Sequence, residues 1–179
     1  MLTTEQVSHF ETFGFLVLRQ VFSAQEVATI RKETDEIFDE ARGGKPYTGE
    51  LEIIHPFFER RPFMAGLVAD DRIYSIGEGI LGPDFFLDVT EGWRHVGPTT
   101  WHGDGLFAEG LPDIKIAFYI EPLRKENGCL RVVPGSHIRS DPDLLTPLRD
   151  ECRDPDFMAF GLPQSEAPAI ALESQPGDV

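Results

Sequence analysis

The chain has 179 residues, of which 41% are hydrophobic and 26% charged, a composition that suits one globular domain with a buried core. Its formal net charge is −15, because 31 acidic side chains stand against 16 basic ones. Such a charge repels phosphate groups, so neither nucleic acid nor an anionic membrane surface is an expected partner.

The cysteines and the N-terminal residues indicate the cellular compartment in which the protein is expected. Cys129 and Cys152 are the only two cysteines and do not make a disulfide framework, so we expect reduced thiols. The first residues lack the basic and apolar regions of a signal peptide, and no apolar run approaches membrane-spanning length. We therefore expect a cytoplasmic protein, and the sequence does not predict its oligomeric state.

The first helix is predicted to begin near Thr3 or Thr4 and to end before Gly14. Thr3 and Gln6 have the spacing of a capping box, and glycine is common just beyond the end of a helix. Residues 15–18 are all apolar and predict a short strand.

Two further helices are predicted by the same signals. The second lies between Ser23 and Gly43, with Ser23 and Glu26 as its capping box. The third runs from Asp70 to Leu81 and ends before a glycine and a proline. Between them, residues 45–65 contain several breakers and are predicted to be irregular.

After residue 82 the pattern changes to short runs rich in strand-forming residues. Strands are predicted over residues 85–89, 93–96, 114–121 and 129–133, with Asn127-Gly128 as a turn before the last. Helices followed by short strands indicate an α+β chain whose second part is a sandwich or barrel.

We interpret residues 1–179 as a single domain with four parts. Residues 1–82 are a mainly helical flank, and residues 83–137 hold the barrel strands and a candidate metal motif. Residues 138–176 are acidic and proline-rich, which predicts a loop or insertion. Residues 177–179 read as the start of a further strand.

The candidate metal motif is Thr100-Trp101-His102-Gly103-Asp104-Gly105. Residues two apart on a strand point to the same face, so His102 and Asp104 can reach one metal ion together. Two histidines and one carboxylate are the ligand set of non-haem Fe(II) oxygenases. A His-x-Asp triplet by itself is weak evidence, and its context must carry the interpretation.

The same period of two assigns faces to the neighbouring residues. Thr100 shares the inward face of His102. On the strand over 114–121, Lys115 and Tyr119 share one face, whereas Ile114, Ile116 and Phe118 share the other. The apolar face should pack on helices, so that the Lys115 face lines a cavity. The alternative is an ordinary half-exposed strand with Lys115 in water.

Four stretches in chain order carry a resemblance to a known family. They are residues 10–18 with the helix that follows, 101–105, 115–121, and the run 127–137, Asn-Gly-Cys-Leu-Arg-Val-Val-Pro-Gly-Ser-His. Together they resemble the phytanoyl-CoA dioxygenase (PhyH) family of Fe(II)/2-oxoglutarate-dependent oxygenases. The resemblance implies a double-stranded β-helix, which is a jelly-roll, cupin-like barrel with N-terminal flanking helices.

The resemblance also implies a reaction and roles for named residues. By the resemblance, His102 and Asp104 would be the catalytic metal ligands and Tyr119 would contact the cosubstrate. The face assignments above make Thr100 and Lys115 further candidate contacts to the cosubstrate. Family members are dioxygenases that use Fe(II), 2-oxoglutarate and O₂ to hydroxylate an unactivated C–H of a small organic substrate. Succinate and CO₂ are the coproducts. Nothing in the pattern identifies the substrate.

The family's third metal ligand, a second histidine, and its 2-oxoglutarate-anchoring arginine have no counterpart here. We therefore expect the C-terminal barrel strands to be missing and the 179-residue chain alone to be inactive or nearly so. His137 is a less favoured candidate for the third ligand, because a histidine in a turn usually makes local hydrogen bonds. His95, on a neighbouring predicted strand, is another less favoured candidate. The alternative function is a non-catalytic or truncated member that acts as a small-molecule-binding barrel. A cupin-type metal site is disfavoured, since it usually holds more histidines in its first motif.

Overall fold

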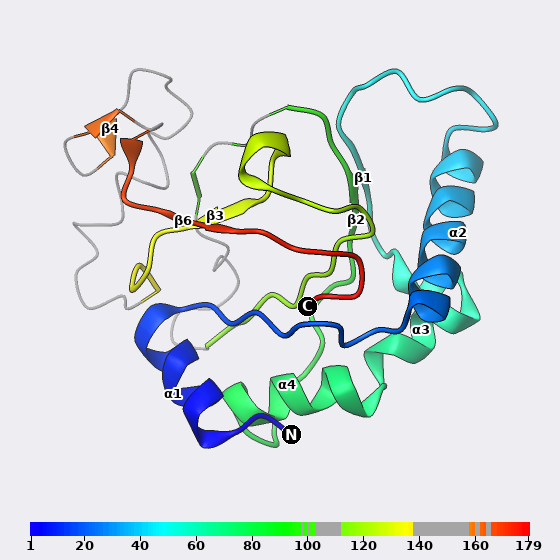
Figure 1. The fold of residues 1–179 in the computed structure, drawn as a ribbon. Helices are drawn as coiled ribbons and strands as arrows, with labels where there is room; N and C mark the ends of the chain where they lie inside the picture. The colour runs from blue at the N-terminus through cyan, green and yellow to red at the C-terminus, as the bar shows by residue number, and fades with distance from the viewer. Residues whose placement is uncertain (98, 100, 103–111, 138–157, 160–161, 164–165) are drawn as a thin grey trace.

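The computed structural model describes residues 1–97, 99, 101–102, 112–137, 158–159, 162–163 and 166–179 (Figure 1). Its helices are α1 (Thr4–Phe13), α2 (Ala24–Ala41), α3 (Pro62–Val68) and α4 (Asp71–Leu81), with short 3₁₀ helices η1 (Phe58–Arg60) and η2 (Lys125–Asn127). Its strands are β1 (Glu52–Ile54), β2 (Gly92–Arg94), β3 (Leu130–Val132), β4 (Met158–Ala159), β5 (Leu162–Pro163) and β6 (Ile170–Leu172). No helix in this described part is long and apolar enough to cross a membrane.

The predicted helix starts are confirmed by their caps. Thr3 and Gln6 form a reciprocal capping box before α1, and Ser23 and Glu26 form another before α2. The Asp70 side chain accepts from the Arg72 backbone N–H at the start of α4. These signals involve residues within four positions of each other, which is why the sequence alone locates them.

The sheets are antiparallel pairs: β1 with β2, β3 with β6, and β4 with β5. The α+β class is confirmed, but among the described residues these pairs do not join into the closed jelly-roll barrel that the resemblance implies. The prediction of a loop over 138–176 is wrong for β6, which pairs with β3 from about 40 positions away. Such a partner lies outside any local sequence window.

Other strand predictions also need correction. Residues 45–65 are not simply irregular, because they contain β1, η1 and the beginning of α3. Residues 85–89 form no strand, and Phe86 is 73% exposed. Residues 114–121 belong to no ladder among the described strands, and residues 120 and 121 lie in a bend. An apolar run becomes a strand only where another segment completes its hydrogen bonds.

The core lies between α2, α3 and the strands beside them (Figure 1). Its fully buried side chains come from the face of α2 that the sequence pattern predicts, from α3, and from two phenylalanines in connecting segments: Phe22, Ile30, Ile37, Phe38, Phe57, Met64 and Leu67. Burial of side chains this large contributes about 2 kcal/mol each to folding. The helical layer is therefore the rigid support for the strands.

The segment over residues 112–120 keeps its predicted alternation even without a ladder. Phe118 and Ile120 pack against the helical core, and the Phe118 ring lies 5.2 Å from the Phe22 ring, centroid to centroid. Lys115 and Ala117 are exposed. Core packing of one face thus directs the Lys115 face away from the helices.

The C-terminal turn is attached to the segment that joins α1 to α2. Residues 15–18 form no strand, but Leu18 and Val179 exchange two backbone hydrogen bonds of 2.8 and 2.9 Å. Asp178, only 3% exposed, accepts hydrogen bonds from Arg19, from the backbone and side chain of Gln20, and from the Gln175 backbone. Residues 177–179 are therefore held by the Asp178 carboxylate and by three backbone hydrogen bonds, two with Leu18 and one with Phe22.

Replacing Asp178 with alanine should lower the free energy of unfolding by about 3 kcal/mol, because Arg19, Gln20 and Gln175 lose a buried, ionised hydrogen-bond acceptor. Urea denaturation followed by circular dichroism measures this change. Glu50→Ala, at an exposed acidic residue, is the control and should change stability by no more than about 0.5 kcal/mol. Equal losses in the two variants would show that the Asp178 network contributes little.

The Asp178 carboxyl also predicts that the stability of the protein depends on pH in the acid range. Burial by itself raises the pKa of Asp178, but hydrogen bonds from the Gln175 and Gln20 amides and from Arg19 outweigh it and hold that pKa well below its usual range. Its contribution is complete above the unfolded-state pKa of about 4 and is lost as the pH falls towards the folded-state pKa. The stability difference between wild type and Asp178→Ala should therefore shrink below about pH 4.

The turn over residues 134–137 is attached to the end of α1. The His137 Nε2 atom lies 2.9 Å from the Glu11 carbonyl oxygen, and the Gly135 N–H donates to the Phe13 carbonyl at 3.0 Å. Gly14 ends α1 in the left-handed region, with φ of 79°, and a Cβ there would lie 2.3 Å from His137 Nδ1. The predicted stop at Gly14 is confirmed, and the close approach of His137 is a second reason for glycine.

Gly14→Ala and Gly43→Ala separate these two reasons. Both glycines have positive φ, but a Cβ at Gly43 meets nothing within 4 Å. Gly43→Ala should cost only the backbone strain of about 1–2 kcal/mol, whereas Gly14→Ala should cost more because it also displaces His137. Thermal unfolding measures both, and equal shifts in melting temperature would contradict the His137 contact.

Candidate functional site

His102 is the described half of the predicted metal pair. Its side chain is exposed rather than sealed in the apolar core, which fits an accessible imidazole ligand. The adjacent Trp101 is half-buried, with the Arg131 Cζ atom 5.4 Å from its ring centroid. This contact places the start of the motif beside β3, where the family-like run over 127–137 lies.

Asp104 and Thr100 lie outside the described residues, so their roles remain predictions. Among the described residues, which do not include Asp104, no three His, Cys, Asp or Glu side chains gather as a metal-binding group. His137 contacts the Glu11 carbonyl and so serves the turn. This contact supports the structural interpretation of His137 over metal ligation.

The β1–β2 pair has two unlike faces. Ile54 packs against the helical core, and Gly92 leaves the room that the Phe57 ring occupies. Arg94, on the same face, lies over the Phe38 ring with its Cζ 4.8 Å from the centroid. The core therefore occupies this face completely, and the opposite face of the pair is left for other contacts.

That opposite face carries Ile53 and Trp93, which stand directly across from each other in the strand register. Their side chains are 41% and 50% exposed. Exposed large apolar side chains that cluster on one face indicate a surface used for binding. The sequence analysis places a strand at Trp93 but assigns this residue no role.

Lys115 extends this face from the neighbouring segment. Its Nζ atom lies 3.8 Å from a Glu91 carboxylate oxygen and 5.9 Å from the Trp93 ring centroid. The Trp93 indole N–H donates to the same Glu91 oxygen at 3.1 Å. The predicted cavity-facing lysine is thus beside an aromatic wall, on the side of the segment directed away from the helices.

Tyr119 shares the Lys115 side by the period of two and is half-buried. The structure therefore brings Lys115 to β2 and the Trp101–His102 dipeptide to β3. Glu91, Trp93 and the whole of β1 were missed by the sequence analysis. The alternation Glu50-Leu51-Glu52-Ile53 is the signal that could have located β1.

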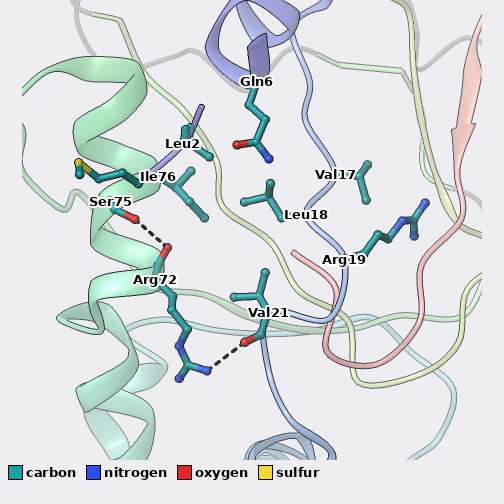
Figure 2. A pocket seen from close by; sticks show the side chains of 10 residues that line it. Leu2, Gln6, Val17, Leu18, Arg19, Val21, Arg72, Ser75 and Ile76 are labelled. Carbon is teal, nitrogen blue, oxygen red and sulfur yellow. Dashed lines mark hydrogen bonds between the residues drawn. The ribbon is translucent and has the colours of Figure 1, made fainter. Parts of the chain in front are cut away.

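A separate hollow of about 400 Å³ lies between α1, α4 and residues 17–21 (Figure 2). Arg72 borders it and donates to the Val21 carbonyl, to Glu26 and to Asp70. Hydrogen bonds from Arg72 lower the pKa of Glu26 to about 2 and that of Asp70 to about 2. These groups satisfy one another, and His102, Lys115 and Tyr119, the predicted site residues that the structure describes, are not among the residues that line this hollow.

Comparisons with known proteins identify relatives of the chain. It is 25% identical over 157 residues to the ectoine dioxygenase of Sphingopyxis alaskensis, covering 76% of this chain and 50% of that protein. The ectoine dioxygenase of Stutzerimonas stutzeri is 27% identical over 157 residues, covering 76% of this chain and 51% of that protein. The L-proline trans-4-hydroxylase of Streptomyces griseoviridis is 28% identical over 158 residues, covering 79% and 58%. The chain thus spans about half the length of the curated relatives it matches.

Solved structures share the fold. The non-heme α-ketoglutarate-dependent carbocyclase SnoK from nogalamycin biosynthesis matches 99% of this chain and 72% of its own, with a TM-score of 0.68 and 21% identity. HygX from Streptomyces hygroscopicus, with nickel and 2-oxoglutarate bound, matches 99% and 76%, with a TM-score of 0.72 and 21% identity. The fold is therefore that of 2-oxoglutarate-dependent enzymes.

A family model decides the classification. The model of phytanoyl-CoA dioxygenase (PhyH) matches residues 10–179, which include the metal motif, the Lys115 segment and the turn at His137. The resemblance read from four short stretches is confirmed over nearly the whole chain. The chain belongs to the phytanoyl-CoA dioxygenase family.

Proposed function

We propose that the chain is part of an Fe(II)/2-oxoglutarate-dependent dioxygenase that hydroxylates an unactivated C–H of a small organic substrate. The observation that supports this most is the family match across the His102 motif, together with the exposed position of His102. The chain spans about half the length of its curated relatives, so we propose this activity for the protein of which the chain is part.

In this proposal His102 and Asp104 hold the metal, which supplies the oxidative decarboxylation of 2-oxoglutarate to succinate and CO₂ with O₂ as oxidant. Thr100, Lys115 and Tyr119 hold the cosubstrate. The Lys115 ammonium neutralises a carboxylate of 2-oxoglutarate, and the Tyr119 hydroxyl donates a hydrogen bond. In a chain of net charge −15, a cation at the site offsets the repulsion of a dicarboxylate.

The protein's other task is to position the substrate and exclude water from the reacting groups. Ile53 and Trp93 form an apolar wall on the face directed away from the helical core. Relatives named for ectoine and L-proline support a substrate that is small and polar rather than a long acyl chain.

His102→Ala should weaken Fe(II) binding by at least about tenfold, since it removes one of the ligands in this chain. Anaerobic calorimetry of Fe(II) binding, followed by titration with 2-oxoglutarate, measures the loss. The control is His55→Ala, which removes an exposed histidine outside the motif. If both variants bind Fe(II) as the wild type does, the metal is held elsewhere and the non-catalytic binding barrel becomes the better proposal.

Lys115→Met should raise the dissociation constant of 2-oxoglutarate about tenfold, because a charge-assisted bond contributes about 1.5–3 kcal/mol. The metal-loaded protein is titrated with 2-oxoglutarate by calorimetry. Lys32→Met removes an exposed lysine on α2 and should leave the constant unchanged. An unaltered constant in Lys115→Met would assign this lysine to the solvated strand face instead.

A further inference from the structure

We propose, resting on the function above, that Glu91 and Trp93 bind a cationic nitrogen of the substrate. In the structure, the Lys115 ammonium lies beside Glu91 and Trp93, where this nitrogen would bind. When 2-oxoglutarate binds, its carboxylate attracts the Lys115 ammonium away from Glu91 and Trp93, so that the substrate cation can bind there. The ligand class is therefore a small organic cation or zwitterion carrying an ammonium, quaternary ammonium or amidinium group on a compact apolar body.

Three contacts carry this inference. The Lys115 Nζ atom lies 5.9 Å from the Trp93 ring centroid, and it lies 3.8 Å from a Glu91 oxygen. The Trp93 indole N–H donates to that same oxygen at 3.1 Å, which holds the carboxylate beside the ring. The carboxylate therefore lies at the N–H edge of the indole while the ammonium lies over the ring, and a carboxylate and an aromatic face together favour a positive charge.

The Lys115–Glu91 pair is suited to exchange. Its atoms are separated by more than a normal hydrogen bond, and the two side chains are 52% and 26% exposed. Solvent-exposed ion pairs of this kind are weak. Another cation can therefore replace the ammonium at little cost, whereas a buried bidentate pair would resist replacement.

The surroundings restrict the body of the ligand. Ile53 stands directly across from Trp93, and both side chains are about half exposed on the face that the core leaves open. A compact apolar body can lie on this pair while its cation reaches Glu91. An anionic ligand without a cation would face the Glu91 carboxylate and be repelled.

The shared lysine couples the two ligands. In this proposal the Lys115 ammonium leaves Glu91 and Trp93 when it contacts a 2-oxoglutarate carboxylate. Cosubstrate binding should therefore strengthen cation binding, and by thermodynamic linkage the cation should strengthen cosubstrate binding equally. The site then favours binding of the substrate after the cosubstrate.

Calorimetric titration with choline tests the proposal, and the neutral analogue in which carbon replaces the choline nitrogen is the control ligand. In the wild type, saturating 2-oxoglutarate should tighten choline binding about two- to fivefold, with no effect on the neutral analogue. Lys115→Met should bind choline tightly without 2-oxoglutarate. Lys115→Met combined with Glu91→Gln should lose that gain, whereas Lys115→Met combined with Glu126→Gln, at an exposed glutamate in η2, should keep it.

The outcomes separate the two proposals. If 2-oxoglutarate does not bind but Lys115→Met still prefers choline to its neutral analogue, the cation site stands and the proposed function fails. If Lys115→Met binds both ligands equally or binds neither, the cation site is overturned even where 2-oxoglutarate binds. Circular dichroism and thermal unfolding of each variant show that the comparison is made between folded proteins.

Discussion

The packing of Phe118 and Ile120 against the helical core is the interaction on which the candidate site depends. It fixes one face of an extended segment that has no ladder of its own among the described strands. Because side chains alternate, the same packing directs Lys115 to the opposite face, beside β2. The hydrophobic layer thereby positions a charged group that it does not contact.

The N-terminal segment stabilises this arrangement through distant contacts. Its end before α2 holds Asp178 and pairs with Val179, and the end of α1 receives the turn at His137. Specific hydrogen bonds thus join residues that are more than 120 positions apart in the chain (Figure 1).

Charge and shape on the open face are consistent with a small polar ligand. The chain carries a net charge of −15, yet Lys115 and Arg131 each lie beside a tryptophan of the predicted site region. Aromatic rings stabilise these cations while leaving them near solvent. A lysine held in this weak way can change partners, which a lysine in a buried ion pair cannot do.

The sequence by itself determined the boundaries of α1, α2 and α4, the two faces of residues 114–121 and the family. Caps and alternation are local, so Thr3, Ser23 and Asp70 signal their structures without knowledge of the rest of the chain. Only the tertiary structure decided that Glu52–Ile54 pairs with β2, that Ile170–Leu172 pairs with β3, and that Trp93 and Glu91 meet Lys115. A strand needs a partner to complete its hydrogen bonds, and a site needs side chains from several segments. Both requirements are met by contacts between residues far apart in the chain, which no local pattern records.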